Sequence, residues 1–338
     1  TDPIVLTAVE DGAEVALPTQ VDALVGKLKR LALLRRKPAA QKNLALMFWN
    51  YPAGEKNLGA SNLNVPASIE NLTRALDGAG YDVPPLSEHE MIDAAQAMLG
   101  GLYRSVPLDD LLERNLAEAF PVANYERWVN ALPPAKRHAF SHGGEPGKHW
   151  AVREVDGMPS FIIPRLKRGK LIIMPQMPRG EILGAHYHDT YAPPDHLYLA
   201  AYLYLREQAG ADAIIHLGTH STQEWLPGKD RGLAADDDPF LAVSDIPVFY
   251  PYIQDNVGEA LQARRRGRAV TVSHQTPPFA PSGLYDGLRD IHHLVHEYVQ
   301  LDEGPVREKT EKEIADAAVA ANMNADLGWS EEAARADF

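Results

Sequence analysis

Two histidines and a glutamate follow one another closely in the second half of the chain. His216, His220 and Glu224 lie at positions i, i+4 and i+8. Neutral imidazole is a good ligand for cobalt, nickel, zinc and iron, and it also transfers protons near neutral pH. The apolar neighbours Trp225 and Leu226 can raise the pKa of the Glu224 carboxyl group and make it a proton acceptor or donor. These residue types indicate metal binding combined with proton transfer.

Three interpretations of this group remain open from the residues alone. The first is a reaction that transfers a transition metal while N–H protons are removed. The second is a metallohydrolase with a His/His/Glu site, although the absence of His-Glu-x-x-His excludes the zincin class. The third is structural: His216 would end a strand, and Ser221-x-x-Glu224 would form a helix capping box.

Further histidines precede this group in two other segments. His186 and His188, in the run His-Tyr-His-Asp that ends at Asp189, would point to one side of an extended segment. That arrangement suits a shared metal or an acid–base pair. The range 133–149 ends with Lys148 and His149 and is expected to be a long irregular connection. Long loops in compact domains are often functional.

A parallel sheet is expected to position these groups. Apolar runs bounded by turn residues predict its strands, at 43–49, 170–174, 213–217, 247–252 and 269–273. Helical patterns alternate with several of these runs, which is typical of β-α-β units and a parallel sheet. Ligands bind at the carboxyl ends of strands in open α/β sheets, where the strand at 213–217 delivers His216. We predict an α/β fold with largely parallel sheets, flanking helices, a helical insertion and at least two subdomains.

The helical insertion is expected over residues 87–131. A capping box, Ser87-x-x-Glu90, would open its first helix, and two shorter helices are predicted at 108–120 and 125–132. The division of the whole chain that we predict is a preceding region or linker helix at 1–40, an α/β subdomain with the helical insertion at 41–132, an α/β core with the His/Glu site at 133–305, and a peripheral helix at 306–338.

Composition and charge exclude several classes of function. Hydrophobic residues make up 45% and the net charge is −13, which suits a globular protein without a general nucleic-acid-binding face. The basic runs 27–37 and 264–268 fit solvated helix faces, and the acidic run 236–238 fits a solvated loop better than a cation site. No cysteine is present, so disulfides, thiolate metal sites and a cysteine nucleophile are excluded. No run of residues is long and apolar enough to span a bilayer, and a cytoplasmic protein is expected.

A glycine-containing loop after the strand at 43–49 raises the question of nucleotide binding. Gly54 and Gly59 have P-loop spacing, but Ala60 and Ser61 follow where a P-loop requires Lys and Ser or Thr. An ordinary strand-to-helix loop is therefore favoured over direct ATP binding. The chain starts at Thr1 rather than methionine, and we expect a segment of a longer polypeptide or a processed chain.

Several motifs, in order along residues 43–296, resemble one protein family. They are Asn50-Tyr-Pro-Ala-Gly with Asn57-Leu-Gly59, the run 169–176, His188-Asp189 with Pro193-Pro194, the run 216–229 and the run 270–278. Together they resemble the large subunit of class I tetrapyrrole chelatases, a group with the CobN-type subunit of aerobic cobaltochelatase and the H-type subunit of magnesium chelatase. The sequence Glu-Trp-Leu-Pro-Gly-Lys from Glu224 to Lys229 is more similar to the CobN type than to the H type of magnesium chelatase.

The resemblance implies a subunit that binds a tetrapyrrole and inserts a divalent metal, with Co²⁺ into hydrogenobyrinic acid a,c-diamide as the expected reaction. ATP would be hydrolysed, as Mg-ATP, only by separate AAA+ partner subunits of the CobS/CobT type. The family's proposed catalytic glutamate and histidine correspond to Glu224 and His220, and His186, His188, His216 and His220 would handle the metal. The residues expected at the tetrapyrrole are Asn50, Tyr51, Lys148, His149, Gln176, Asp189, Trp225 and Lys229. Family members are longer, so this chain would be a central fragment or a shortened relative.

Two other functions stay open beside this one. A magnesium chelatase H-type subunit, or a related chelatase or dechelatase, would use the same residues on another ring and metal. A metal-independent tetrapyrrole-binding scaffold would bind the ring without any contribution from the histidines to cobalt affinity.

Overall fold

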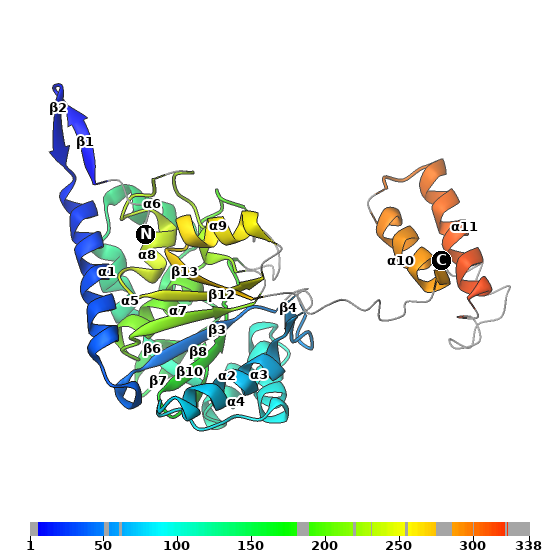
Figure 1. The fold of residues 1–338 in the computed structure, drawn as a ribbon, viewed down its shortest axis with the longest axis horizontal. Coiled ribbons are helices and arrows are strands. Elements are labelled where there is room, and N and C mark those ends of the chain that lie inside the picture. Colours follow the sequence, from blue (N-terminus) through cyan, green and yellow to red (C-terminus); the bar gives the residue numbers. More distant parts are fainter. Residues whose placement is uncertain are drawn as a thin grey trace. The chain divides into compact units, whose positions relative to one another are not determined.

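The computed structural model describes residues 6–50, 54–60, 63–180, 189–218, 221–230, 232–253, 256–274, 286–299, 301–321 and 323. The chain divides into two compact units, Thr1–Gln275 and Thr276–Phe338 (Figure 1). The predicted four-part division remains a prediction. Its ranges 41–132 and 133–305 both contribute strands to the central sheet of the first unit.

Six strands form that central sheet, in the order β13-β12-β11-β3-β10-β9. Their bounds are β3 Leu44–Phe48, β9 Leu166–Arg168, β10 Leu171–Pro175, β11 Ala213–Leu217, β12 Val248–Ile253 and β13 Ala269–His274. All neighbouring pairs are parallel except β9 with β10. Every residue of β3 is buried, as expected for an inner parallel strand. The prediction of an α/β fold with a largely parallel sheet is confirmed.

The strand order creates a topological switch point at the carboxyl ends of the parallel strands. Strand β3 comes first among the parallel strands, the next one (β10) lies on one side of it, and the third (β11) lies on the other. The connections that leave β3 and β11 therefore run to opposite faces of the sheet. Such a switch point is the usual ligand-binding position in doubly wound α/β sheets. It lies at the carboxyl ends of β3, β10 and β11.

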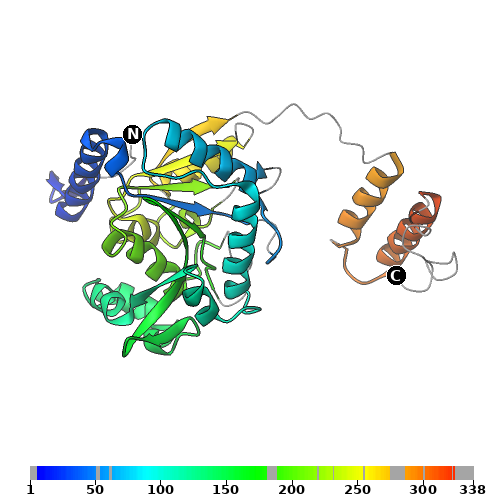
Figure 2. The same cartoon turned by 90° about the horizontal axis from the view of Figure 1, so that it is seen from below.

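Helices flank this sheet in the first unit (Figures 1 and 2). Their bounds are α1 Pro18–Arg36, α2 Val65–Gly78, α3 Glu88–Leu102, α4 Leu108–Glu113, α5 Val122–Asn130, α6 Pro134–Ser141, α7 His196–Glu207, α8 Asp238–Val243 and α9 Val257–Arg265. Helix α3 begins with the predicted capping box of Ser87 and Glu90. Helix α7 is buried from His196 to Leu205, and Asp195 caps it by accepting a hydrogen bond from the Leu197 amide.

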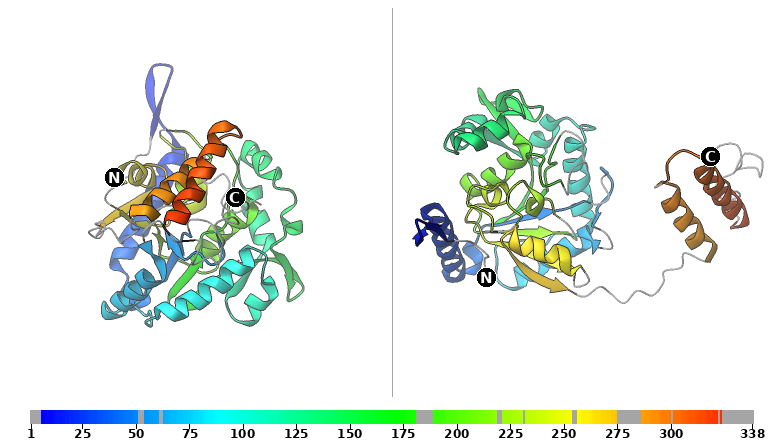
Figure 3. Two further views of the ribbon diagram at one scale, coloured as in Figure 1. Left: turned by 90° about the vertical axis from the view of Figure 1, so that its right-hand side faces the viewer. Right: turned by 90° about the horizontal axis from the view of Figure 1, so that it is seen from above.

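A three-stranded antiparallel sheet, in the order β6-β8-β7, adjoins α7 through β8. Its strands are β6 Ala117–Pro121, β7 Val152–Val155 and β8 Met158–Pro164. Asp156 and Gly157, both with positive φ, form the hairpin turn between β7 and β8. The unit also contains two short hairpins: β1 Thr7–Glu10 with β2 Ala13–Ala16, which projects beyond α1 (Figure 3), and β4 Gly59–Ala60 with β5 Leu63–Asn64.

Two expectations for the middle of the chain were wrong. The helix predicted at 108–120 ends at Glu113, because Asn115 adopts a positive φ and β6 pairs with β8. The segment 133–149 is not irregular throughout: Pro134 occupies the first turn of α6, where a proline is well tolerated. In both cases the local pattern was too short to reveal which partner the segment would meet.

The second unit contains α10 Asp286–Tyr298 and α11 Pro305–Ala320, which pack on each other around Ile291, Ile314 and Ala318. The rings of His292 and His296 lie with their centroids 4.5 Å apart, and both side chains are exposed. Among the described residues of the whole chain, no helix is both long and apolar enough to cross a membrane.

Candidate functional site

The carboxyl ends of β10 and β11 are joined by the side chain of Gln176. This residue follows β10 directly, and its backbone amide donates to the carbonyl of Phe48 at the end of β3 (2.9 Å). Its Nε2 donates to the Ser221 hydroxyl (3.0 Å), and its Oε1 accepts from the Thr222 amide (3.0 Å). The loop after β11 is therefore fixed to β10 at the switch point by one buried amide.

Two tyrosines of α7 complete the surroundings of Gln176. The Gln176 Nε2 lies 3.1 Å from the hydroxyl of Tyr202 and 3.3 Å from that of Tyr198. The Tyr198 hydroxyl is also 3.0 Å from the Thr222 hydroxyl. Burial is the main cause that raises the pKa of both tyrosines, so both stay protonated at neutral pH. This pair was not predicted from the sequence, although its i, i+4 spacing on a helix shows that the two tyrosines share one face.

His216 is held inside this network. Its Nε2 lies 3.2 Å from the Tyr202 hydroxyl and its Nδ1 lies 3.1 Å from the Ser221 hydroxyl. The ring also meets Tyr250 edge-on, with centroids 5.7 Å apart. Burial lowers the pKa of His216 to about 3, so the imidazole is neutral at physiological pH. Both ring nitrogens thus have hydrogen-bonding partners, and the predicted metal role of His216 stays a prediction.

Glu224 lies in a short 3₁₀ helix, η3 Gln223–Trp225, and its side chain is 1% exposed. The capping-box interpretation of this residue was wrong. The helix begins after Thr222 without a side-chain cap, and the Ser221 hydroxyl is used by His216 and Gln176 instead. The Tyr250 hydroxyl approaches Glu224 Oε1 at 3.5 Å. A buried carboxylate placed at a switch point is a strong candidate for proton transfer.

One guanidinium group fixes the backbone that carries Glu224. Arg266, just after α9, donates from Nε to the Glu224 carbonyl (2.7 Å) and from Nη2 to the Leu226 carbonyl (2.6 Å). Its Nη1 donates to the carbonyl of Lys229. The residue is buried, and desolvation lowers the pKa of its guanidinium group. The prediction that the basic run 264–268 is a solvated helix face was therefore wrong for Arg266.

The same correction applies to other charged runs. Lys27 is buried and donates from Nζ to the Arg268 carbonyl (2.6 Å). The prediction of a solvated acidic loop was wrong for Asp237 and Asp238, which are both buried, whereas Asp236 is exposed. Asp238 pairs with Lys136 Nζ at 2.6 Å, and burial is the main cause that raises the pKa of the Asp238 carboxyl group. Charge blocks are usually solvated, but here each buried charge meets an opposite charge or a backbone group.

Asp237 also organises the loop in which Lys229 lies. It accepts from the Ala234 amide (2.7 Å) and forms an ion pair with Lys229 Nζ (3.3 Å). The side chain of Lys229 is 60% exposed. Its predicted contact with a tetrapyrrole would have to compete with this ion pair.

A second histidine cluster surrounds the start of α7. His149 accepts from the Ala151 amide at Nδ1 (3.2 Å), so its Nε2 carries the hydrogen that meets the Asp195 carboxylate at 3.0 Å. His196, the first residue of α7, lies 2.8 Å from the Tyr125 hydroxyl through Nδ1 and 3.2 Å from the Gly144 carbonyl through Nε2. Burial is the main cause that lowers the pKa of His196. Both rings tie loops to α7.

A cavity of about 700 Å³ borders this cluster. Its lining includes His149 and Lys148, the latter paired with Glu145 at 2.8 Å, and the Arg104 guanidinium lies over the Trp150 ring. The cavity is large enough for part of a small-molecule ligand. The predicted substrate-binding roles of Lys148 and His149 remain predictions.

The other predicted site residues are partly described. Asn50 donates from Nδ2 to the Gly54 carbonyl (3.1 Å), and Asp189 accepts from the amides of Tyr191 and Ala192 in a turn. Trp225, next to Glu224, is half-buried. Tyr51, His186, His188 and His220 lie outside the described residues. Within the described ranges, no three His, Asp or Glu side chains form a metal-binding group.

Comparisons with known proteins agree with this arrangement. Residues 2–338 match the protein family described as CobN/Magnesium Chelatase. The aerobic cobaltochelatase subunit CobN of Pseudomonas aeruginosa is 36% identical over 82% of this chain and 22% of its own length. The H-type magnesium-chelatase subunit of Rhodobacter capsulatus is 30% identical over 94% of this chain and 26% of its own length.

A solved structure shows the same fold. The catalytic subunit of cobaltochelatase from Mycobacterium tuberculosis superposes with a TM-score of 0.69 and 31% sequence identity, over 96% of this chain and 28% of that subunit. The chain thus spans about a quarter of the length of these relatives. The predicted resemblance is confirmed: the chain belongs to the CobN/magnesium chelatase family.

Proposed function

We propose that this chain forms the proton-accepting part of a tetrapyrrole chelatase subunit that inserts Co²⁺ into hydrogenobyrinic acid a,c-diamide. The observation that carries the proposal is Glu224, a buried carboxylate fixed at the sheet's switch point in a member of this family. A divalent metal replaces N–H protons of the ring, so insertion needs a base beside the ring nitrogens. Glu224 accepts these protons, assisted by His220.

The surroundings of Glu224 support this role. Arg266 holds its backbone, Gln176 holds the preceding loop, and Tyr250 contacts its carboxylate. A base that is already fixed needs little reorganisation when the proton is transferred. His216 stays neutral and orients the network, and His186, His188, His216 and His220 are the proposed handlers of the substrate metal.

The tetrapyrrole is proposed to lie along the loops that follow β3, β10 and β11. Asn50, Tyr51, Gln176, Trp225 and Lys229 come from these loops or their continuation. Lys148, His149 and Asp189 are the proposed contacts farther from the switch point. The higher identity with a CobN subunit than with an H-type subunit favours cobalt over magnesium.

ATP hydrolysis is assigned in this proposal to separate AAA+ subunits of the CobS/CobT type in the cytoplasm. The loop at 50–59 lacks the Lys and Ser or Thr of a P-loop, which supports ATP hydrolysis by other subunits rather than by this chain. A metallohydrolase would instead turn over a substrate without ATPase partners and retain stoichiometric zinc. Family membership favours the chelatase.

The decisive variant is Glu224→Gln in the complete natural subunit, assayed with its ATPase partners. We expect metal insertion to fall by about a hundredfold or more, as for the loss of a general base, while tetrapyrrole binding changes little. Absorbance of the metallated ring measures insertion, and fluorescence quenching measures binding. Glu126→Gln, a change at an exposed glutamate of α5, is the matched control. Insertion by Glu224→Gln at the control's rate would refute the role of Glu224.

A competition assay separates cobalt from magnesium. With equal Co²⁺ and Mg²⁺ and each of the two rings, a corrin precursor or protoporphyrin IX, the proposal predicts that cobalt enters the corrin precursor. Magnesium entry into the porphyrin would place the chain with the H-type subunits.

A further inference from the structure

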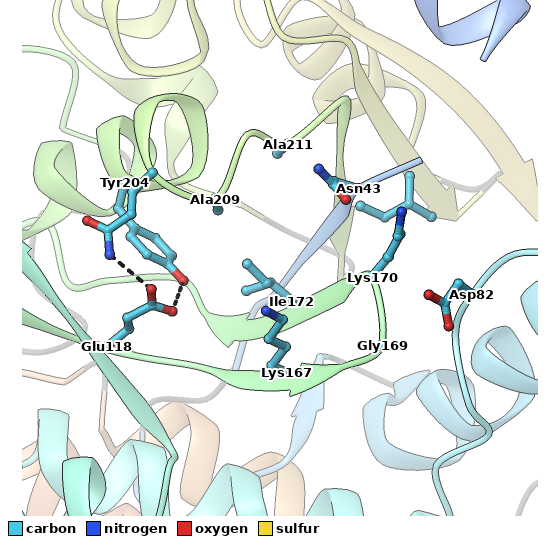
Figure 4. Close-up of a pocket in the computed structure, with 12 residues that line it drawn as sticks. Asn43, Asp82, Glu118, Lys167, Gly169, Lys170, Ile172, Tyr204, Ala209 and Ala211 are labelled. Carbon is cyan, nitrogen blue, oxygen red and sulfur yellow. Dashed lines mark hydrogen bonds between the residues drawn. The ribbon is translucent and has the colours of Figure 1, made fainter. Parts of the chain in front are cut away.

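A polar cavity of about 420 Å³ lies at the opposite edge of the central sheet, where the parallel strands begin (Figure 4). Asn43, Lys170 and Ala211 contribute to its lining, and they precede β3, β10 and β11 respectively. The switch-point site lies at the other ends of the same strands. This cavity therefore belongs to a separate part of the first unit, and nothing in the proposed insertion reaction uses it.

One wall of the cavity carries a carboxylate whose charge is already compensated. Glu118 accepts from the Tyr204 hydroxyl (2.8 Å) and from Gln208 Nε2 (2.9 Å), and it pairs with Arg165 Nε at 3.1 Å. Burial raises the pKa of the Glu118 carboxyl group, and these hydrogen bonds and Arg165 outweigh that effect, so its pKa is lowered overall. The carboxylate is ionised and accepts from three donors, one of which is the cation Arg165.

The opposite side carries two ammonium groups without such compensation. Lys167 of β9 and Lys170, just before β10, line the cavity, and neither Nζ has a hydrogen-bond or ion-pair partner among the described residues. Figure 4 shows both side chains extending from the β9–β10 hairpin, between Glu118 and Asp82 in that view. Asp82 also lines the cavity, so the carboxylates of Asp82 and Glu118 stand against the cations of Arg165, Lys167 and Lys170. Three positive charges against two negative ones leave one surplus positive charge and a positive potential in the cavity.

The hairpin that carries the lysines is fixed in place. Gly169 has a φ of +59°, and a Cβ atom there would lie 2.4 Å from the Asp82 carbonyl oxygen. That same oxygen accepts the Lys170 amide at 2.7 Å. Only glycine permits this approach, so the turn is docked on the segment around Asp82. The two lysine side chains consequently extend from an ordered backbone.

Apolar side chains form the rest of the lining. They are Leu44, Ile172, Ala209 and Ala211, and Leu44 and Ala211 are buried. A fully hydrated inorganic ion gains nothing from such a surface. A molecule with an apolar body does, because it removes this surface from water.

We infer that this cavity binds a small amphipathic anion, whose carboxylate or phosphate groups meet Lys167 and Lys170 while its apolar body covers Ile172 and Ala209. Each ammonium–anion contact in a partly enclosed site strengthens binding by a factor of about three to five. The two together change the dissociation constant by about tenfold to thirtyfold. Binding weakens as the salt concentration rises, since the charges are partly exposed.

The test uses phthalate as the probe, with its dimethyl ester and inorganic phosphate as comparisons, in isothermal titration calorimetry on the full chain. Phthalate is expected to bind at least about tenfold more tightly to the natural chain than to the Lys167→Ala/Lys170→Ala double variant. The uncharged ester and inorganic phosphate are expected to bind more weakly than phthalate. Lys29→Ala, at an exposed lysine of α1, is the matched control and should bind like the natural chain.

Location is tested by the rate at which an amine-reactive acetylating reagent modifies each lysine. Phthalate is expected to slow modification of Lys167 and Lys170 but not of Lys29. Ala209→Leu, which fills the apolar side and leaves both charges, should weaken phthalate binding by about fivefold. The inference fails if phthalate binds equally to the double variant, if phosphate binds as tightly as phthalate, or if Ala209→Leu has no effect.

Discussion

The carboxyl ends and the amino ends of the parallel strands form two edges of the central sheet, here called the carboxyl edge and the amino edge. They differ in how far their polar groups are buried and hydrogen-bonded. At the carboxyl edge, His216, Glu224 and Gln176 are buried, and the hydrogen bonds around them link β10, β11 and α7. At the amino ends of the strands, Lys167 and Lys170 line a partly enclosed cavity, and neither ammonium group has a hydrogen-bond or ion-pair partner among the described residues. A buried network fixes the position of a group, whereas a free exposed charge remains available for a ligand. The buried groups stabilise the fold, whereas the lysines without partners can bind a ligand.

Replacement of Arg266 should have the largest effect on stability at the carboxyl edge. Arg266→Met leaves three carbonyls of the 224–229 loop without their donor, each in a buried or half-buried place. We expect a loss of about 3 kcal/mol in the free energy of unfolding, measured by urea denaturation of this chain. In the complete subunit, insertion should slow more than tetrapyrrole binding weakens, because Glu224 loses its fixed position.

Two further variants test whether Arg266 acts through the several N–H donors of its planar guanidinium group. Arg266→Lys keeps the charge but has a single ammonium, so it should recover only part of the stability and of the insertion rate. Arg265→Ala, at the exposed neighbour, should change the free energy of unfolding by no more than about 0.5 kcal/mol. An Arg266→Met variant as stable as Arg265→Ala would show that the buried network does not hold this loop.

The pH dependence of stability should reveal the burial of His216. Its pKa is about 3 in the folded chain against a reference value of 6.5, so the unfolded chain takes up the proton first as the pH falls. The contribution of His216 is therefore constant above the reference pKa and is lost progressively below it. Between pH 7 and pH 5 the loss amounts to about 2 kcal/mol.

The His216→Gln variant isolates this contribution. It cannot titrate, so its free energy of unfolding should fall by about 2 kcal/mol less than that of the natural chain between pH 7 and pH 5. His196, whose pKa burial also lowers, and Asp238, whose pKa burial raises, contribute to both proteins and cancel in the difference. His89→Gln, at an exposed histidine, should behave like the natural chain. Equal pH slopes in His216→Gln and the natural chain would place His216 in contact with water.

The inner strands were predictable because their patterns are local. The apolar run at 43–49 is long enough to indicate a buried strand by itself, and β3 confirms it. The capping box at Ser87 likewise involves only residues within one turn. By contrast, residues 117–121 form β6 only because β8, distant in sequence, offers its edge. Sequence periodicity over a few residues contains no information about that partner.

The same contrast between local patterns and partners distant in sequence applies to the candidate site. The position of Glu224 after a strand was visible in the sequence, and the family resemblance that rested on this region is confirmed. The role of Arg266 was not visible, because its three acceptors are carbonyls, which every residue has. The partners of His216 on α7 were also hidden, since Tyr202 precedes it by a whole helix-to-strand connection. Residue types predict which chemistry is possible, and only the fold shows which groups are already occupied.

The smallest effect on stability is expected at the amino edge. Lys167→Ala/Lys170→Ala removes two charges that have no partner among the described residues, so the free energy of unfolding should change by no more than about 0.5 kcal/mol. Urea denaturation at the same salt concentration as for Arg266→Met measures this change. A loss above about 1 kcal/mol would mean that these lysines support the fold as Arg266 does, and the contrast between the two edges would disappear. If stability is unchanged and phthalate binding is lost, the two lysines act in ligand binding, because the described part of the fold does not need them for its stability.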